Sequence, residues 1–301
     1  MKAAAATNIG KINVYNCQPP YVFFIKERII GVFNGHGRHG HTAATTAADV
    51  FASATEVDPD TFAAADAAVC ADLPPLESNI MGGTSATVVQ INEEGTLIVA
   101  HLGEGSVVWI FDAEDAEGRK ITKDHTLRNR RERERIYTNP NSLLEEPLPV
   151  PAAPESSSIV LKPCCDRHSH ENRWDGYNFH TGIGGCRHLR LTRALGNPHL
   201  KPYGFLADPT ITVTPPPTKT RAVVVASSGV FDRLTPEQVR AVVFSDHLLG
   251  DAAAAADALL KAAEEAHERL YYKVYFKDER TGHEWADIPR YLHFTVVVAY
   301  T

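Results

Sequence analysis

The sequence predicts an α+β domain of antiparallel strands and helices, on the strength of three observations. Three short runs rich in β-forming residues follow one another closely: Thr84 to Ile91, Thr96 to His101 and Val107 to Phe111. The link Asn92-Glu93-Glu94-Gly95 is typical of a hairpin turn, and strands joined by short turns are normally antiparallel. Helical segments flank these runs: His39 to Ala54, Asp60 to Ala71 and Asp251 to Leu270. We find no internal repeat or domain boundary, so we expect residues 1–301 to form a single domain.

Composition narrows the classes of function. The net charge of −7 and the pI near 6.0 argue against a general nucleic-acid-binding protein. The N-terminal residues lack the apolar segment of a secretion signal, and no apolar run is long enough to span a bilayer, so we expect no membrane association. Five cysteines, an odd number in a long chain, fit a reducing compartment better than a disulfide framework. We therefore expect a cytoplasmic or nuclear protein.

The remaining elements follow from local patterns. We expect four further strands: Tyr21 to Ile25, Arg28 to Phe33, Arg221 to Ala226 and Phe294 to Tyr300. The third of these is a continuous apolar run, which indicates burial on both faces and an end in a turn at Ser227-Ser228-Gly229. Asp58 or Asp60 lies near the start of the second helix. Thr235-Pro236-Glu237-Gln238 is a strong helix start, with a threonine cap and proline in the first position.

Two segments carry many polar residues. Asp124 to Tyr137 is charged and helical, and its pairs Arg128/Glu132 and Arg130/Glu134 have i,i+4 spacing, which predicts a solvated helix face. Residues 138–186 are rich in proline, serine and glutamate at their start, which predicts a loop or insertion.

The stretch from Gly31 to His41, GVFNGHGRHGH, has the form of a ligand-binding loop. Val32 and Phe33 end a predicted strand, glycines follow, and a helix begins near Thr42. Glycine lets the backbone come close to a ligand. The polar residues of this stretch include no acid: Asn34, His36, Arg38, His39 and His41.

Seven blocks of the chain then follow one another in the order of one family. They are GVFNGHGR (31–38), GGTSA (82–86), VAHLGEGS (99–106), ITKDH (121–125) with ERERI after it, TRALGN (192–197), ASSGVFD (226–232) and LHFTVV (292–297). They resemble the VFDGHGG, GGSTA, VANVGDSR, LTxDH with ERxRI, SRALGD, ASDGLWD and DNxTVI blocks of the metal-dependent protein phosphatases of the protein phosphatase 2C family. The resemblance covers nearly the whole chain. It implies a four-layer αββα sandwich, in which two antiparallel β-sheets are flanked by helix pairs.

The same resemblance implies a site for two divalent cations, Mg²⁺ or Mn²⁺, which need carboxylate ligands. The family's carboxylates are missing here. Asn34, Ser228 and Leu292 stand at three of the four acidic positions, and residues 14–18 offer no clear match to the fourth or to the nearby phosphate-binding arginine. His36 matches the histidine proposed as general acid and follows Gly35. Other acids survive at matching positions: Glu104 in the GDSR block, and Asp124 and Asp232, which match ligands of an additional, weaker metal. Both of the last two also suit turn-capping roles, which we favour.

We interpret the chain as a catalytically inactive homologue, a pseudophosphatase that acts as a protein-binding, regulatory or structural subunit. Binding of Mg²⁺ or Mn²⁺ is then lost or weak, no cofactor is expected, and a protein partner is. One alternative is an atypical metal-dependent Ser/Thr phosphatase that rebuilds its site from Glu104, Asp124, Asp232 or the histidines. A second is a reader of phosphate or phosphopeptides, with an anion site at His36, Arg38 and His39.

The predicted insertion raises a separate question. It gathers possible zinc ligands, chiefly Cys164, Cys165, His168 and Cys186, with His170, His180 and His188 in or beside it. Their spacing does not match the usual paired pattern of a zinc site. We favour an exposed loop, with zinc binding as the alternative.

Overall fold

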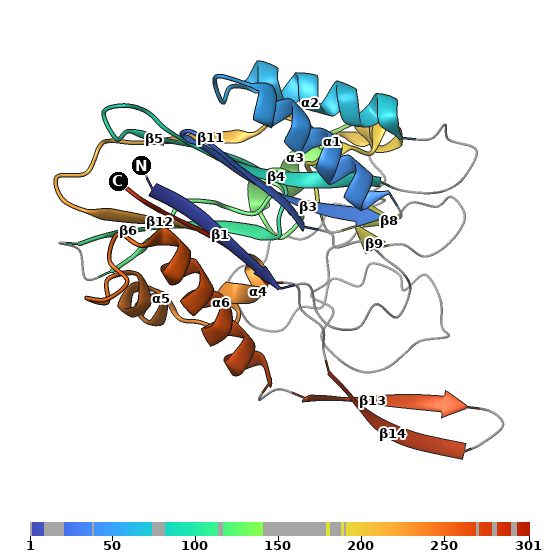
Figure 1. Ribbon diagram of the computed structural model, residues 1–301. Coiled ribbons are helices and arrows are strands. Elements are labelled where there is room, and N and C mark those ends of the chain that lie inside the picture. Colours follow the sequence, from blue (N-terminus) through green and yellow to red (C-terminus); the bar gives the residue numbers. More distant parts are fainter. Residues whose placement is uncertain are drawn as a thin grey trace.

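Two antiparallel sheets face each other in the computed structural model, and helices cover their outer faces (Figure 1). The structure describes residues 2–8, 21–37, 39–73, 82–113, 117–140, 179–180, 188–189, 191–268, 271–278, 282–289 and 294–301. Helices α1 (Gly40–Ser53) and α2 (Pro59–Asp72) lie over one sheet. Helices α5 (Pro236–Val243) and α6 (Ala252–Glu268) lie under the other. This arrangement confirms the α+β class and the αββα order of layers.

The first sheet has the strand order β11-β5-β4-β3-β2. Its strands are β11 (Thr210–Thr214), β5 (Leu97–Leu102), β4 (Gly82–Ile91), β3 (Ile29–Gly37) and β2 (Tyr21–Lys26), with the short β10 (Leu195–Gly196) beside the start of β4. The second sheet has the order β1-β15-β12-β6-β7. Its strands are β1 (Lys2–Asn8), β15 (Phe294–Tyr300), β12 (Arg221–Ser227), β6 (Ser106–Asp112) and β7 (Arg119–Lys120).

The other elements connect or extend the sandwich. They are α3 (Arg130–Tyr137), α4 (Ser228–Phe231), a 3-10 helix (Pro198–Tyr203), the pair β8 (Phe179–His180) and β9 (His188–Leu189), and the hairpin of β13 (Tyr271–Asp278) and β14 (Gly282–Pro289). In Figure 1 this hairpin projects away from the two sheets. No helix among the described residues is both long and apolar enough to cross a membrane.

The core consists of three main layers of buried side chains, and β12 contributes to two of them. Val223 and Val225 point between the sheets, whereas Val224 points toward α5 and α6. Every residue of β12 is buried, which confirms the prediction made from its continuous apolar run. On the other side, the rings of Phe33, Phe51 and Phe62 pack in series under α1 and α2, with centroid separations of 5.6 and 4.8 Å.

The predicted helix starts are confirmed. The Asp58 carboxylate caps α2 by accepting from the backbone N–H of Thr61 at 2.8 Å. Thr235 and Gln238 form a reciprocal capping box at the start of α5. Such caps satisfy backbone N–H groups that lack partners within the helix. Because the capping side chain lies within three residues of that N–H group, the local sequence predicts the cap.

Three of the predicted elements need correction. The strands β4 and β5 form the expected hairpin, but the third run, β6, crosses to the other sheet and pairs with β12. The helix predicted from Asp124 begins only at Arg130, because the His125 N–H bonds to the Gly103 carbonyl and Asn129 caps the helix. The turn predicted at the end of β12 is the short helix α4.

The charged face of α3 is only partly solvated. Arg130 and Glu134 form an exposed ion pair at 2.7 Å, as their spacing predicts. Glu132, in contrast, is buried, and its carboxylate accepts from Arg193, Arg135 and Thr192 at 2.5 to 3.0 Å. The prediction of a solvated face is therefore wrong for Glu132, since its main partner comes from a segment distant in sequence.

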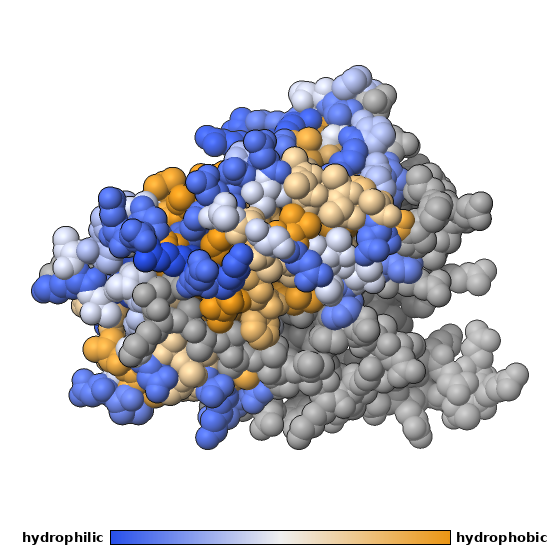
Figure 2. Space-filling model, turned by 45° about the horizontal axis from the view of Figure 1, so that its top comes forward, coloured by the Kyte–Doolittle hydropathy of each residue, from blue (hydrophilic) through white to orange (hydrophobic). Residues whose placement is uncertain are grey.

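The outer face of the α1 and α2 layer mixes polar and apolar surface. In the view of Figure 2 the described part shows blue hydrophilic groups beside pale and orange apolar ones. Alanine side chains contribute to the apolar part of this surface, because both helices are alanine-rich and α2 buries only Phe62, Ala65 and Val69. Exposed alanine supports a helix at little entropic cost.

Candidate functional site

The glycine-rich stretch is a strand for most of its length. β3 continues to Gly37, so Asn34, Gly35 and His36 pair with Ser85, Thr84 and Gly83 of β4. The chain then turns into α1 so tightly that a Cβ on Gly35 would overlap the backbone of Gly40. The prediction of a loop directly after Phe33 is therefore wrong. The strand extends because the GGTSA block offers it a partner of matching length.

Three of the family-like blocks meet at the turn between β5 and β6, Gly103 to Gly105. The Gly103 carbonyl accepts from the N–H of His125 at 2.8 Å, and the Gly105 carbonyl accepts from the N–H of Ser228 at 2.9 Å. The side-chain amide of Asn34 packs directly against Gly105. The structure thus brings together the positions of Asn34, Glu104 and Ser228, and it ties His125, the neighbour of Asp124 in sequence, to the same turn.

The chemistry of this set does not fit a pair of divalent cations. Asn34 and Ser228 offer only neutral oxygens, and the nearby acids Glu104 and Asp124 are partly buried. Asp232 is exposed, and its backbone N–H bonds to the Ser228 carbonyl at the end of α4. Among the described residues, no three His, Cys, Asp or Glu side chains are close enough to hold a metal ion. Leu292 and residues 14–18 lie outside the part of the chain that the structure describes.

His36 is held by a residue that the sequence analysis did not select. Asn197, fully buried and at φ +50°, donates from Nδ2 to His36 Nε2 at 2.8 Å. Within the described residues, Asn197 Oδ1 is enclosed without a hydrogen-bond partner. Burial lowers the pKa of His36 to about 4, and the Asn197 bond offsets only part of this effect. The His36 ring is therefore neutral near pH 7.

Asn197 could have been found from the sequence. It stands where the SRALGD block of the family ends in aspartate, so it repeats the change from acid to amide seen at Asn34. The TRALGN block is anchored to α2, because Asp66 accepts from the Gly196 N–H at 2.8 Å and from Lys201 at 2.9 Å. The sequence therefore carries a weak signal for Asn197.

The other residues of the predicted anion site are less clearly defined. Arg38 lies outside the described residues. His39 precedes α1, is partly exposed, and makes no side-chain capping bond. Because the pKa of His36 is lowered, that residue adds no positive charge at neutral pH.

Two histidines beside the turn, His101 and His125, were not predicted as a site. His101 and His125 stack with ring centroids 5.4 Å apart. His101 Nε2 donates to the Gly103 carbonyl at 3.1 Å, and the Gly103 N–H donates to His125 Nδ1 at 3.1 Å. The outer nitrogens bond to Thr87 and Thr210 at 2.8 Å. No signal in the sequence links the two histidines, because they belong to separate blocks.

Both rings of this pair are held neutral. Burial, and then repulsion from His125, lowers the pKa of His101 to about 3. Burial, and then the charge of Arg193, lowers the pKa of His125 to about 4. Each neutral ring can accept one hydrogen bond and donate one. Together the two rings bond to both the carbonyl and the N–H of Gly103, and so stabilise the turn from Gly103 to Gly105.

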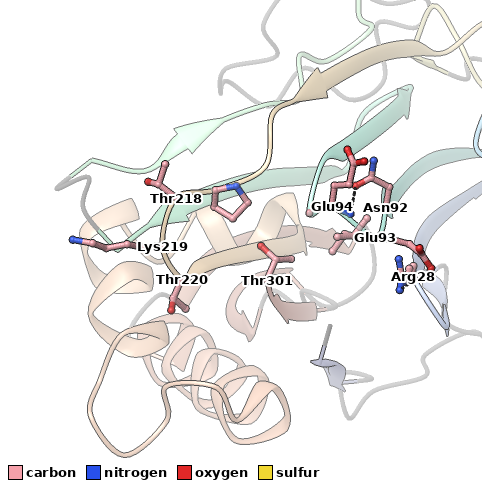
Figure 3. A pocket seen from close by; sticks show the side chains of 11 residues that line it. Arg28, Asn92, Glu93, Glu94, Thr218, Lys219, Thr220 and Thr301 are labelled. Carbon is pink, nitrogen blue, oxygen red and sulfur yellow. Dashed lines mark hydrogen bonds and ion pairs between the residues drawn. The ribbon is translucent and has the colours of Figure 1, made fainter.

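A hollow lies at the opposite end of the sandwich (Figure 3). It has a volume of about 410 Å³ and lies between the turn of the β4–β5 hairpin and the residues before β12. Arg28 and Glu93 form an ion pair of 3.3 Å beside it. Asn34 and Ser228 lie near the other ends of β3 and β12, so this hollow is separate from the candidate site.

The proposed zinc ligands Cys164, Cys165, His168 and Cys186 lie outside the described residues, as does most of the 138–186 insertion. Of the neighbouring histidines, His180 and His188 stand opposite each other in the backbone pairing of β8 with β9. Zinc binding stays a prediction.

A Gly105→Ala substitution is expected to destabilise the protein by about 3 kcal/mol, because the new methyl group strains a backbone at φ +97° and displaces the Asn34 amide. Gly250→Ala is the matched control. Gly250 has φ +82° but nothing within 4 Å of the added Cβ, so about 1 kcal/mol is expected. Urea unfolding of both variants measures the difference. Equal losses would show that Asn34 does not pack against the turn.

The αββα sandwich, with the family-like blocks gathered at one end of its strands, is the fold of the metal-dependent protein phosphatases. The family model for protein phosphatase 2C matches residues 25–147 and 165–268. The chain belongs to the protein phosphatase 2C family.

Solved structures share the fold at low sequence identity. The serine-threonine phosphatase 2C of Toxoplasma gondii superposes with a TM-score of 0.66 at 16% identity, covering 99% of this chain and 94% of that one. The catalytic domain of the phosphatase PstP, solved with two manganese ions, gives 0.53 at 15% identity, covering 100% and 98%. A C. elegans sex determining protein gives 0.61 at 16% identity, covering 99% of this chain and 64% of that one. A search of curated protein sequences finds no match.

Proposed function

We propose that this protein is a pseudophosphatase: a phosphatase-2C fold that has lost catalysis and serves as a protein-binding, regulatory or structural subunit. The observation that carries the proposal is the composition of the turn from Gly103 to Gly105. There the Asn34 amide packs against Gly105 and the backbone N–H of Ser228 bonds to the Gly105 carbonyl, and the resemblance implies carboxylates at both positions.

The physical argument for lost catalysis is the missing negative charge at the cation site. Two divalent cations held close together repel each other, and a site binds both only if anionic ligands offset that repulsion. The neutral oxygens of Asn34 and Ser228 supply no such charge. Without the cations the family's water nucleophile is not activated, because its pKa is lowered by the metal.

The first test is phosphatase activity of the purified protein on a phosphoester, with Mn²⁺ or Mg²⁺. We expect turnover no greater than that of the metal ions alone. The rival proposal, an atypical phosphatase that uses Glu104, Asp124 or Asp232, requires metal-dependent turnover that disappears in Asp232→Ala. That result would overturn the proposal.

The second test restores the acids. A variant with Asn34→Asp, Ser228→Asp and Leu292→Asp is expected to bind Mn²⁺ at least about tenfold more tightly than the wild type, measured by calorimetric titration. The control, Asn92→Asp, adds a carboxylate in the turn of the β4–β5 hairpin and is expected to leave Mn²⁺ affinity unchanged. Tight Mn²⁺ binding by the wild type would contradict the proposal.

The reader of phosphorylated partners is the less favoured alternative. It rests on His36, Arg38 and His39, and the neutral ring of His36 removes one of the charges that it needs. A titration with phosphopeptide near pH 7 separates the two. Affinity in the micromolar range that is lost in Arg38→Ala would favour the reader.

A further inference from the structure

Among the described strands, β11 forms one edge of the first sheet, and it carries no charged residue. Its sequence, Thr-Ile-Thr-Val-Thr, has no charge, and it bonds to β5 on one side only. Ile211 is 37% and Val213 63% exposed. The edge strands β2 and β7, in contrast, contain Lys26 and the pair Arg119–Lys120. Charged residues on an edge strand oppose association with another strand.

The exposed side chains of β11 extend an apolar strip across the sheet. Ile211 stands opposite Ala100 and Val213 opposite Ile98, so all four point to the face that bears α1 and α2. Helix α1 packs over β2, β3 and β4. The strip of Ile98, Ile211 and Val213 therefore lies at the margin of the helix layer, where Ile211 and Val213 remain open to solvent.

We propose that two copies of this chain associate edge to edge through β11, antiparallel, with a two-fold axis at Thr212. A two-fold interface must be self-complementary. The pattern Thr-Ile-Thr-Val-Thr reads almost the same in both directions, so Thr212 faces itself and Ile211 faces Val213 of the second copy. The two apolar strips then join on one face of a continuous sheet.

The residues that flank β11 indicate which segment can pair with it. Pro209 precedes β11, and Pro215, Pro216 and Pro217 follow it. Proline has no N–H to donate, so pairing stops at both ends after five residues. A second β11 has the same length and the same uncharged chemistry. An extended peptide from another protein would find no charged group on this strand to specify it.

Sedimentation velocity of the full chain over a wide micromolar range tests the proposal. We expect a shift with concentration from the 33.0 kDa monomer to twice that mass. Val213→Lys places a charge on the edge and is expected to weaken the dimer at least about tenfold. Leu249→Lys, at a residue 48% exposed between α5 and α6, is the matched control and is expected to leave the dimer intact.

Disulfide trapping tests the register. In the proposed pairing the Cβ atoms of the two Thr212 residues are about 5 Å apart, whereas the two Val213 residues lie on a diagonal of about 7–8 Å. Under a mild oxidant, Thr212→Cys should therefore link two chains faster than Val213→Cys, with the wild type showing the background from native cysteines. A monomer at every concentration, a dimer that survives Val213→Lys, or equal trapping of both cysteine variants would overturn the proposal. A monomer that instead binds an extended peptide at β11 would do the same.

Discussion

A Glu132→Gln variant is expected to lose about 3 kcal/mol or more of stability, because removing one partner of a buried ion cluster leaves the other charges uncompensated. Glu132 is 3% exposed, and Arg193 binds both of its oxygens. This contact ties α3 to the TRALGN block, which in turn holds His36 through Asn197. Urea unfolding followed by circular dichroism measures the loss.

Glu134→Gln is the control on the same helix. The Arg130–Glu134 pair is exposed, so its loss is expected to cost less than about 0.5 kcal/mol. Similar losses in the two variants would show that the Glu132 cluster contributes no more than a surface pair.

The pH dependence of Glu132 follows from its partners. Burial by itself would raise the pKa of this carboxyl, but hydrogen bonds from Arg193, Arg135 and Thr192 outweigh burial and lower the pKa to about 2. The stabilisation is therefore complete above the unfolded value near 4.5 and is lost as the pH falls toward 2. The stability difference between wild type and Glu132→Gln should shrink across this window.

Stability is expected to fall markedly between pH 7 and pH 5, and His101 and His125 account for a large part of the fall. Their folded pKa values, about 3 and 4, lie below the ordinary value of 6.5, so the unfolded chain binds more protons in this range. Each neutral buried ring can then cost up to about 2 kcal/mol at pH 5 relative to pH 7. The loss begins near pH 6.5 and continues until the folded rings themselves titrate.

His101→Asn tests this origin, because asparagine can hydrogen-bond at the site but does not titrate. We expect the difference in unfolding free energy between pH 7 and pH 5 to be about 2 kcal/mol smaller than in the wild type. His247→Asn, at an exposed residue before α6, is expected to leave that difference unchanged. Equal pH dependence in all three proteins would contradict the assignment.

Features with local signals were predictable. The hairpin of β4 and β5, the caps at Asp58 and Thr235 and the buried β12 each depend on residues close together in sequence. The length of β3 was not predictable from the sequence, because its last four residues pair with Gly82–Ser85. Glu132 is spaced from Arg128 like a member of a surface ion pair. In the structure it is buried instead and bonds to Arg193, 61 residues away.

The identity of the family, and the absence of acids at positions 34 and 228, are properties of the chain itself and could be read before any folding. Folding alone brings Asn34 and Ser228 to the turn at Gly103–Gly105, stacks His101 on His125 and places β11 at an edge of the sheet formed by the described strands. The physical reason is that these contacts join residues far apart in sequence. Their formation depends on the packing of two whole sheets, which no short stretch of residues encodes.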